Sequence, residues 1–234
     1  MVISKDIRKL AGSKLRHYTV TQGACSDGSL VYMVFERKDP RRCKIAVYDM
    51  KRGKVVRVSG ALKLGHGNDI CIRDGIIYAT HSEGSKTIHR VNASTLKQMK
   101  GVKVTIPKKF KDKHIKEFNA ICCYGSGFLI RVMGGRGMVV VNKAMKVTRY
   151  FKTDTSYKTS QGMTMDGKTI LRAFSSLQSG KNYIVEYSVK GKEKRRYKAK
   201  IGGEMEGVFV LGGKRYVTAY IKKDGRCEAF IAEA

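Results

Sequence analysis

The stretch His66-Gly67-Asn68-Asp69-Ile70-Cys71-Ile72-Arg73-Asp74-Gly75-Ile76-Ile77-Tyr78-Ala79-Thr80 decides how this chain folds. It consists of a polar head and two short apolar segments joined by Asp74-Gly75. Asp-Gly between apolar segments is a strong hairpin signal, because a type I′ turn needs a positive φ at both central residues. The stretch therefore predicts two antiparallel strands on either side of this turn.

Four further stretches repeat the pattern of polar head, strand, tight turn and strand, over residues 21–35, 118–132, 160–174 and 205–219. The five polar heads are Gln22, Asn68, Asn119, Gln161 and Glu206. Their spacings, by subtraction, are 46, 51, 42 and 45 residues. A strand-rich repeat with a period in the forties is typical of the blade of a β-propeller.

Each copy continues with a charged or Gly-rich turn and a third strand, at Cys43–Tyr48, Thr87–Val91, Met138–Val141, Tyr183–Tyr187 and Cys227–Ile231. Four copies add a more polar fourth strand, near residues 55–58, 97–104, 147–151 and 194–200. The fifth copy stops after its third strand. We expect residues near Lys14–Val20 to supply the missing strand, because closing the ring removes open sheet edges. Residues 108–116 fall in the longest spacing, and we interpret them as a basic loop.

The sequence thus predicts an all-β fold, a five-bladed β-propeller with four antiparallel strands per blade. An N-terminal strand completes the last blade and closes the ring. We expect one propeller domain over residues 1–234, with blades beginning near residues 21, 66, 117, 160 and 204. The chain has only two prolines and no Gly/Ser-rich linker, which argues against two separate domains.

The chain carries a large positive charge. Lys and Arg number 48 against 19 Asp and Glu, a formal net charge of +29. Such an excess attracts polyanions, so we expect an anionic polymer or glycan as partner. Nucleic acid is an alternative partner. A second alternative is that the surface is generally basic and has no dedicated partner.

The sequence contains no apolar run long enough for a membrane span, and residues 1–17 lack the apolar core of a secretory signal. As written, the chain is expected to be a cytoplasmic monomer. It would be secreted or placed at the cell surface if a leader had been removed.

In a propeller the first strand of each blade lines the central channel, so the polar heads are expected to converge there. Gly or Ala directly follows the head in four copies, a size that permits close backbone approach. The ring of polar groups either forms a structural plug or orients a small polar ligand. The residues expected at this channel mouth are Gln22, His66, Asn68, Asp69, Asn119, Gln161, Glu204 and Glu206.

Two further roles are open for the titratable members of this group. Glu206 and His66 are the candidates for acid–base catalysis. Asp69, Glu204 and Glu206 are the candidates for ligating a channel-bound metal ion. Against both roles, a His beside Gly more often makes a loop hydrogen bond. His66 and Asp69 are the residues that the other copies lack.

Basic residues concentrate in and beside the turns between second and third strands, on the face where the polar heads lie. This basic rim comprises Arg37, Arg41, Arg42, Lys86, Arg131, Arg136, Lys181, Lys222 and Arg226. A polar, partly acidic centre inside a basic rim suits an anionic chain or small anion approaching that face.

Three of the six cysteines, Cys25, Cys71 and Cys122, each lie three residues after a polar head. Cysteines at equivalent repeat positions behave as small buried apolar residues. Adjacent Cys122 and Cys123 are expected on opposite faces of their strand, an arrangement unsuited to a shared metal.

Thr21-Gln22-Gly23, followed by Asp27-Gly28 and by Glu206-Gly207 in the last copy, resembles the five-bladed glutaminyl cyclases of plants and bacteria. The head of residues 65–69 also resembles those of uncharacterised propellers in Gram-positive bacteria. The cyclase resemblance implies that Gln22 and Glu206 are the first candidates for a reaction at the axis. That family is rich in tryptophan around its substrate pocket, and this chain has none.

The leading hypothesis is a binding module that presents a basic face and a polar channel to an anionic polymer, glycan or small anionic ligand. The first alternative is an enzyme acting at the channel mouth, of the glutaminyl cyclase type or another. The second is a scaffold that binds another protein.

Overall fold

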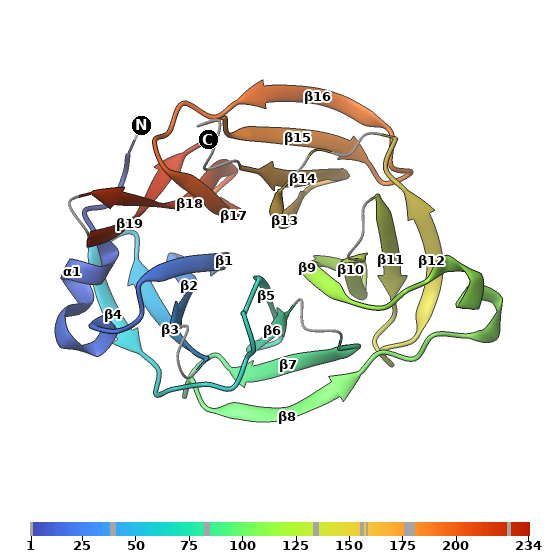
Figure 1. Cartoon of the computed structure of the whole chain (residues 1–234), viewed down its shortest axis with the longest axis horizontal. Coiled ribbons are helices and arrows are strands. Elements are labelled where there is room, and N and C mark those ends of the chain that lie inside the picture. The colour runs from blue at the N-terminus through green and yellow to red at the C-terminus, as the bar shows by residue number, and fades with distance from the viewer. Residues whose placement is uncertain are drawn as a thin grey trace.

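The computed structural model describes residues 2–37, 41–81, 85–132, 136–154, 157, 159–175, 181–223 and 226–234, with the backbone alone for Lys223 and Arg226. Five antiparallel sheets surround a central channel, each with its first strand at the channel and its last strand outside (Figure 1). The predicted five-bladed propeller is confirmed.

The blades follow one another along the chain. Blade one contains β1 (Val20–Asp27), β2 (Leu30–Arg37), β3 (Arg42–Asp49) and β4 (Lys54–Val58). Blade two contains β5 (Asp69–Arg73), β6 (Ile76–Thr80), β7 (Thr87–Asn92) and β8 (Gln98–Lys103). Blade three contains β9 (Phe118–Tyr124), β10 (Gly127–Val132), β11 (Gly137–Val141) and β12 (Val147–Lys152). Blade four contains β13 (Ser160–Asp166), β14 (Thr169–Phe174), β15 (Tyr183–Ser188) and β16 (Glu193–Lys198). Blade five contains β17 (Glu204–Leu211), β18 (Lys214–Lys223) and β19 (Arg226–Glu233).

The N-terminus closes the ring, but with an earlier segment than residues 14–20. Val2 forms an antiparallel bridge with Ala232, and the Ile3 amide donates to the Ile231 carbonyl at 2.8 Å. The Ser4 Oγ accepts from the Ile231 amide at 2.7 Å. Residues 2–4 therefore lie along the outer edge of β19, where a fourth strand belongs.

Residues 7–15 are helical instead of extended. They form α1 (Ile7–Ala11) and the 3₁₀ helix η1 (Gly12–Leu15), which pack their buried Ile7, Ala11 and Leu15 into the core between blades five and one. Asp6 caps α1, since its Oδ1 accepts from the Arg8 amide at 3.0 Å. A second 3₁₀ helix, η2 (Lys108–Lys113), occupies the segment that we interpreted as a basic loop.

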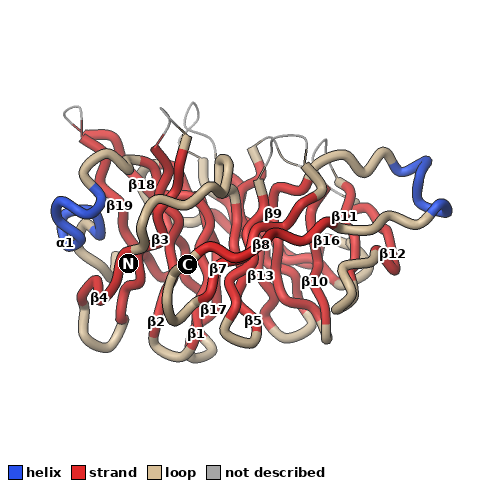
Figure 2. The backbone as a smooth tube through the Cα atoms, turned by 90° about the horizontal axis from the view of Figure 1, so that it is seen from below, coloured by secondary structure: helices blue, strands red, loops and turns tan. Residues whose placement is uncertain are grey.

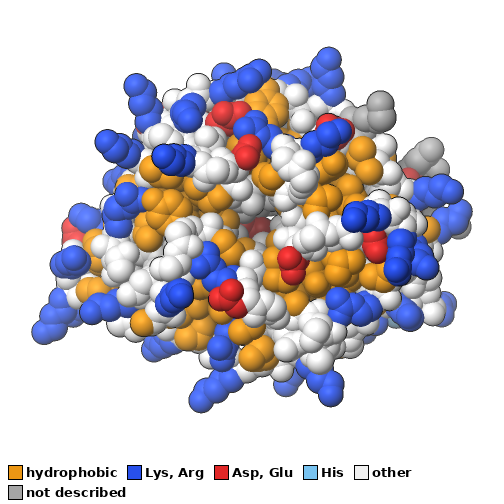
Figure 3. Space-filling model, turned by 180° about the vertical axis from the view of Figure 1, so that it is seen from behind, with side chains coloured by type: hydrophobic (Ala, Val, Ile, Leu, Met, Phe, Trp, Pro, Cys, Tyr) orange, Lys and Arg blue, Asp and Glu red, His pale blue; other side chains and the backbone are white. Residues whose placement is uncertain are grey.

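The two faces of the ring differ, and Figure 2 places them at its top and bottom. We call the face where the first strand of each blade begins the upper face, and the face of the first hairpin turns the lower face. The opening stretch forms one of these hairpins, with φ of 50° at Asp74 and 70° at Gly75, as a type I′ turn requires. On the lower face, Lys and Arg side chains crowd the rim, and hydrophobic side chains surround a hollow near the centre (Figure 3).

The hydrophobic core consists of clusters packed between neighbouring blades. The cluster between blades two and three, for example, joins Ile88 of β7 to Phe118, Ile130 and Val139 of blade three, all fully or almost fully buried. Strands covered on both faces in this way explain the continuous apolar runs of the sequence. No helix in the described ranges is long and apolar enough to cross a membrane.

Four of the five first strands carry a β-bulge at the polar head. The strand register shifts between Thr21 and Ala24, between Phe118 and Ala120, between Ser160 and Met163, and between Met205 and Gly207. β5 pairs with β6 without such a shift. Because a bulge redirects a side chain, the head of blade two differs in geometry from the other four.

Candidate functional site

Asp69, the first residue of β5, lies at the axis of the ring and is fully buried. Its Oδ2 accepts hydrogen bonds from the Ile121 amide of blade three at 3.0 Å and from the Met163 amide of blade four at 3.1 Å. One carboxyl group thus links three blades. Among the predicted channel residues, Asp69 is therefore the one whose carboxyl group bonds to the backbone of two other blades.

The strands around Asp69 approach closely because glycines face it. A Cβ on Gly23 would lie 2.3 Å from the Asp69 Cα, and a Cβ on Gly162 would lie 2.9 Å from the Asp69 Oδ1. A Cβ on Gly207 would lie 2.9 Å from the Ala24 amide nitrogen. The glycine after the head of blades one, four and five is therefore required by crowding at the axis.

Burial raises the pKa of Asp69 from 3.8 to about 8, although hydrogen bonds from the Ile121, Met163 and Ile70 amides act in the opposite direction. The second carboxyl oxygen, Oδ1, is buried and has no hydrogen-bond partner. At neutral pH this carboxyl group is therefore mainly protonated, which suits a structural plug.

Near the upper end of the channel, Glu36 forms the centre of a small charged group. Its side chain is 1% exposed, and its Oε1 lies 2.9 Å from the His66 Nδ1 and 3.2 Å from the Arg41 Nε. Glu36 stands at the end of β2, after the apolar run of that strand, so the strand positions it beside the axis. The His66 ring nitrogen thus faces the Glu36 carboxyl group.

Two carboxyl groups of blade five lie in the same region. The Glu204 Oε1 accepts from the Gln161 Nε2 at 3.2 Å, and its Oε2 accepts a hydrogen bond from the Tyr220 hydroxyl. Burial raises the pKa of Glu206 well above its usual value, and the charges of Glu204 and Glu36 raise it further. Three carboxyl groups from two blades therefore influence one another at this end of the channel.

The structure does not bring Asp69, Glu204 and Glu206 together as metal ligands. Among the described residues, no group of three or more His, Cys, Asp or Glu side chains is arranged to hold a metal ion. Asp69 instead faces backbone amides, and Glu204 faces Gln161 and Tyr220. The remaining heads line the channel differently: Gln22 and Asn119 are 4% and 7% exposed, whereas Asn68 is half-buried ahead of β5.

Two arginines are buried side by side between blades three and four. Arg131 and Arg172 are 7% and 1% exposed. The Arg172 Nη2 donates to the Ser160 Oγ at 3.0 Å, and the Arg131 Nη1 donates to the Ser160 carbonyl at 3.3 Å. Burial lowers the pKa of Arg131 to about 9, helped by the charge of Arg172, and lowers that of Arg172 to about 10.

No carboxylate in the described part of the chain pairs with either arginine. The Arg172 guanidinium instead lies over the rings of Phe174 and Tyr187, at 4.7 and 5.4 Å from their centroids. The Nε atoms of both arginines are buried without a hydrogen bond. Buried charges are normally paired, so within the described residues this pair is an exception, two guanidinium groups without a carboxylate partner.

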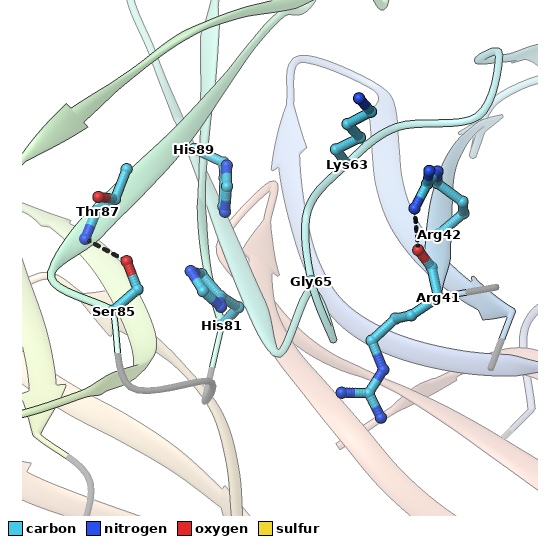
Figure 4. Close-up of a pocket in the computed structure, with 8 residues that line it drawn as sticks. All are labelled: Arg41, Arg42, Lys63, Gly65, His81, Ser85, Thr87 and His89. Carbon is cyan, nitrogen blue, oxygen red and sulfur yellow. Dashed lines mark hydrogen bonds between the residues drawn. The ribbon is translucent and has the colours of Figure 1, made fainter. Parts of the chain in front are cut away.

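A basic pocket opens between blades one and two, with a volume of about 610 Å³. Arg41, Arg42 and Lys63 stand on one side of it, and His81 and His89 stand opposite (Figure 4). The two imidazole rings tilt against each other with centroids 4.8 Å apart. Gly65, Ser85 and Thr87 complete the described lining, in which no side chain is acidic.

The other members of the predicted basic rim differ in their surroundings. Arg37 is half-buried and lies over the Tyr18 ring at 5.8 Å. Arg136 and Lys181 are exposed, and the Arg136 Nη1 donates to the Asp154 carbonyl at 3.0 Å. Lys222 is exposed at the end of β18, and Lys86 lines a separate pocket beside η2. The side chain of Arg226 lies outside the described residues.

Sequence reasoning missed Glu36, Lys63, His81, His89 and Arg172. The signal for Arg172 was a charge inside the otherwise apolar strand Ile170-Leu171-Arg172-Ala173-Phe174, and the signal for Glu36 was an acidic residue directly after the apolar run of residues 30–35. A charge in a strand buried on both faces has to meet a specific partner. Lys63 and the two histidines gave no such signal, because the pocket forms between blades.

No protein family profile matches the chain, and no curated protein matches it in sequence. Solved structures do match. A luciferin-regenerating enzyme is 11% identical over 95% of this chain and 78% of its own, with a TM-score of 0.51. Glutaminyl cyclase from Myxococcus xanthus is 12% identical over 77% of this chain and 74% of its own, with a TM-score of 0.49. The likeness is one of fold. BamB from Moraxella catarrhalis is 13% identical, and the matched part spans 57% of its length, with a TM-score of 0.41.

Proposed function

We propose that this propeller binds a polyanionic chain across its upper face, with one anionic group held in the pocket between blades one and two. The observation that carries the proposal is the composition of that pocket. Two arginines, one lysine and two histidines line about 610 Å³, and no acidic side chain belongs to the described lining, although Arg41 also pairs with the buried Glu36. A volume of this size accommodates a small ligand or one unit of a polymer.

The pocket offers the groups that recognise phosphate or sulfate. The Arg42 guanidinium presents a planar set of donors that fits two oxygens of an oxyanion, whereas the Lys63 ammonium acts as a point charge. His81 and His89 add donors that gain charge as the pH falls. The hydroxyl groups of Ser85 and Thr87 lie at the pocket wall.

Two features outside the pocket support a chain-like ligand. The net charge of +29 produces a long-range field that draws polyanions to the molecule. The buried Arg131–Arg172 pair, which has no carboxylate partner among the described residues, adds positive potential between blades three and four. By contrast, Glu36, Glu204 and Glu206 gather at the channel, so an anionic chain is expected to follow the rim of the upper face and to avoid the axis.

The test is a titration with a fluorescein-labelled heparin oligosaccharide between 50 and 300 mM NaCl. Removing two cations from the pocket in Arg42→Ala/Lys63→Ala should weaken binding by about tenfold or more at 50 mM NaCl. The slope of log affinity against log salt should also become shallower by one to two. The matched control is Lys143→Ala/Lys168→Ala, which removes the same charge from exposed turns of the lower face.

Equal losses in the two double variants would mean that the overall field binds the polymer and the pocket does not. Binding of heparin that is weak and insensitive to salt would overturn the proposal as a whole. If a DNA oligonucleotide of matched charge binds more tightly than heparin, and if this binding depends on the pocket, the ligand is a nucleic acid and the proposed ligand class is wrong.

A further inference from the structure

The lower end of the channel is chemically unlike the upper end. A cavity of about 160 Å³ opens there, lined by the first strands of all five blades. Apart from Ser26 and Thr164, its lining is apolar or sulfur-bearing, and four cysteines belong to it: Cys25, Cys71, Cys122 and Cys123. This sulfur-rich end plays no part in the proposed anion site, which lies on the upper face.

Cys71 and Cys123 meet across the boundary between blades two and three. Both belong to the core cluster at that boundary, Cys71 as a buried member and Cys123 as a half-buried one. Both also line the cavity, Cys71 from β5 and Cys123 from β9. The Cys123 Sγ also donates to the Ile72 carbonyl of blade two at 3.2 Å.

The alternation of β9 explains why Cys123 is the partner and Cys122 is not. Successive side chains of a strand point to opposite faces. Cys122 accordingly belongs to the cluster between blades three and four, whereas Cys123 faces blade two. All six cysteines are free thiols in this structure.

Arg73 makes the two thiols unequal. Its Nη2 donates to the Gly125 carbonyl of blade three at 2.8 Å, which holds the guanidinium beside Cys123. Hydrogen bonds from Cys71 and Arg73 lower the pKa of Cys123 to about 6, against the opposing effect of burial. Burial raises the pKa of Cys25, Cys71 and Cys122 well above the usual value.

A low-pKa, partly accessible thiol beside a second thiol is the arrangement of a nucleophilic cysteine and its resolving partner. We propose that Cys71 and Cys123 form a reversible disulfide that joins blades two and three when the protein meets a hydroperoxide. The proposal rests on the packing of both cysteines in the core cluster at one blade boundary, on the hydrogen bond from the Cys123 Sγ to the carbonyl of Ile72, the neighbour of Cys71, and on their place at an open cavity.

The reaction balances with the hydroperoxide as oxidant. The Cys123 thiolate attacks the hydroperoxide, an S–O bond forms, the O–O bond breaks, and the alcohol or water leaves after taking a proton. Cys123 is then a sulfenic acid. The Cys71 sulfur attacks the Cys123 sulfur, loses its proton and expels hydroxide, which leaves as water. Two thiols are oxidised to one disulfide, and one hydroperoxide is reduced.

The test treats the full reduced chain with one equivalent of hydrogen peroxide, blocks the remaining thiols and maps tryptic peptides without reduction. Cys71 lies in peptide 64–73, Cys25 in peptide 17–37, and Cys122 and Cys123 both in peptide 117–131. We expect a cross-link between peptides 64–73 and 117–131, the loss of two of the six free thiols, and reversal by dithiothreitol.

Variants separate the two cysteines that share a peptide. Cys122→Ser should keep the cross-link, and Cys123→Ser should abolish it. Cys71→Ser should stop the reaction at a sulfenic acid on peptide 117–131, which dimedone traps. Cys227→Ser, a half-buried cysteine outside the cavity, is the control for general thiol loss, and thermal melts establish that each variant is folded.

Three outcomes would overturn the proposal: a cross-link that survives in Cys123→Ser, a link from peptide 17–37 in place of 64–73, or six intact thiols after treatment of the folded protein. None of these measurements involves an anionic ligand. A negative result for the disulfide therefore says nothing about the polyanion proposal, and the two proposals can fail independently.

Discussion

Folding buries the Asp69 carboxyl group at the axis, where its charged form is less stable than in water. The carboxyl group accepts hydrogen bonds from backbone amides, yet no cationic side chain among the described residues forms an ion pair with it. The folded state therefore holds a proton that the unfolded state releases. Because the folded pKa is raised, this proton stabilises the fold below pH 4, and the stabilisation is lost progressively as the pH rises to about 8.

Replacing Asp69 with Asn makes the consequence measurable. Asn keeps an oxygen acceptor for the Ile121 and Met163 amides but has no proton to lose. Between pH 5 and pH 8 the free energy of unfolding of the wild type should fall relative to that of Asp69→Asn by up to about 1.4 kcal/mol per pH unit. Urea unfolding of both proteins at four pH values tests this, and parallel pH profiles would contradict the buried acid described above.

At the scale of single residues, sequence identified His66 and Asp69 as the features that set blade two apart. The structure gives Asp69 the axial position and places His66 against Glu36. The partner Glu36 was not predicted, because it comes from another blade and the sequence spacing does not report contacts between blades. For the same reason, the sequence did not predict that Arg131 and Arg172 would be buried beside each other.

At the scale of elements, repeated hairpins were predictable and the ends of the chain were not. Turn residues and alternating apolar positions are local signals, so the strand positions follow from sequence. Residues 2–6 carry no repeat pattern, and their place along β19 depends on hydrogen bonds to the exposed edge of that strand. Helix α1 was missed because five residues are too few to display a helical period.

The seam of the ring depends strongly on Asp6. Its Oδ1 accepts from the Ala229 amide of β19 at 3.0 Å and from the Arg8 amide of α1 at the same distance. Asp6→Ala should therefore lower the free energy of unfolding by about 1–3 kcal/mol, since it removes a helix cap and leaves a strand amide without its acceptor.

The matched control is Asp112→Ala, which removes an exposed carboxylate from η2 and should leave stability nearly unchanged. Urea unfolding measures both variants. Equal and small losses of unfolding free energy in the two variants would mean that the contacts of the N-terminal segment with β19 contribute little to stability.

At the scale of the whole molecule, charge opposes folding. A net charge of +29 on 234 residues brings like charges together when the chain collapses, and few acidic groups offset them. Salt screens exposed charges, with a Debye length of about 10 Å at 0.1 M. Salt should therefore stabilise the fold while it weakens the binding of polyanions.

We expect the melting temperature, followed by circular dichroism, to rise by about 2–6 °C between 20 and 200 mM NaCl. A sorbitol series of equal osmolality is the control for changes in water activity. A melting temperature that stays constant or falls with NaCl would show that favourable ion pairs outweigh the repulsion.

The axial carboxyl group also limits how blades can be duplicated or deleted during the evolution of such a ring. Proteins built from repeats commonly gain and lose units by duplication, because each unit packs on its neighbours in the same way. Here one unit carries the side chain around which the others close. A duplicated blade two would bring a second Asp69 into a space already crowded by Gly23 and Gly162, and a deleted one would leave the Ile121 and Met163 amides without their acceptor. We therefore expect that an evolutionary change in the number of blades would be accompanied by a replacement of Asp69.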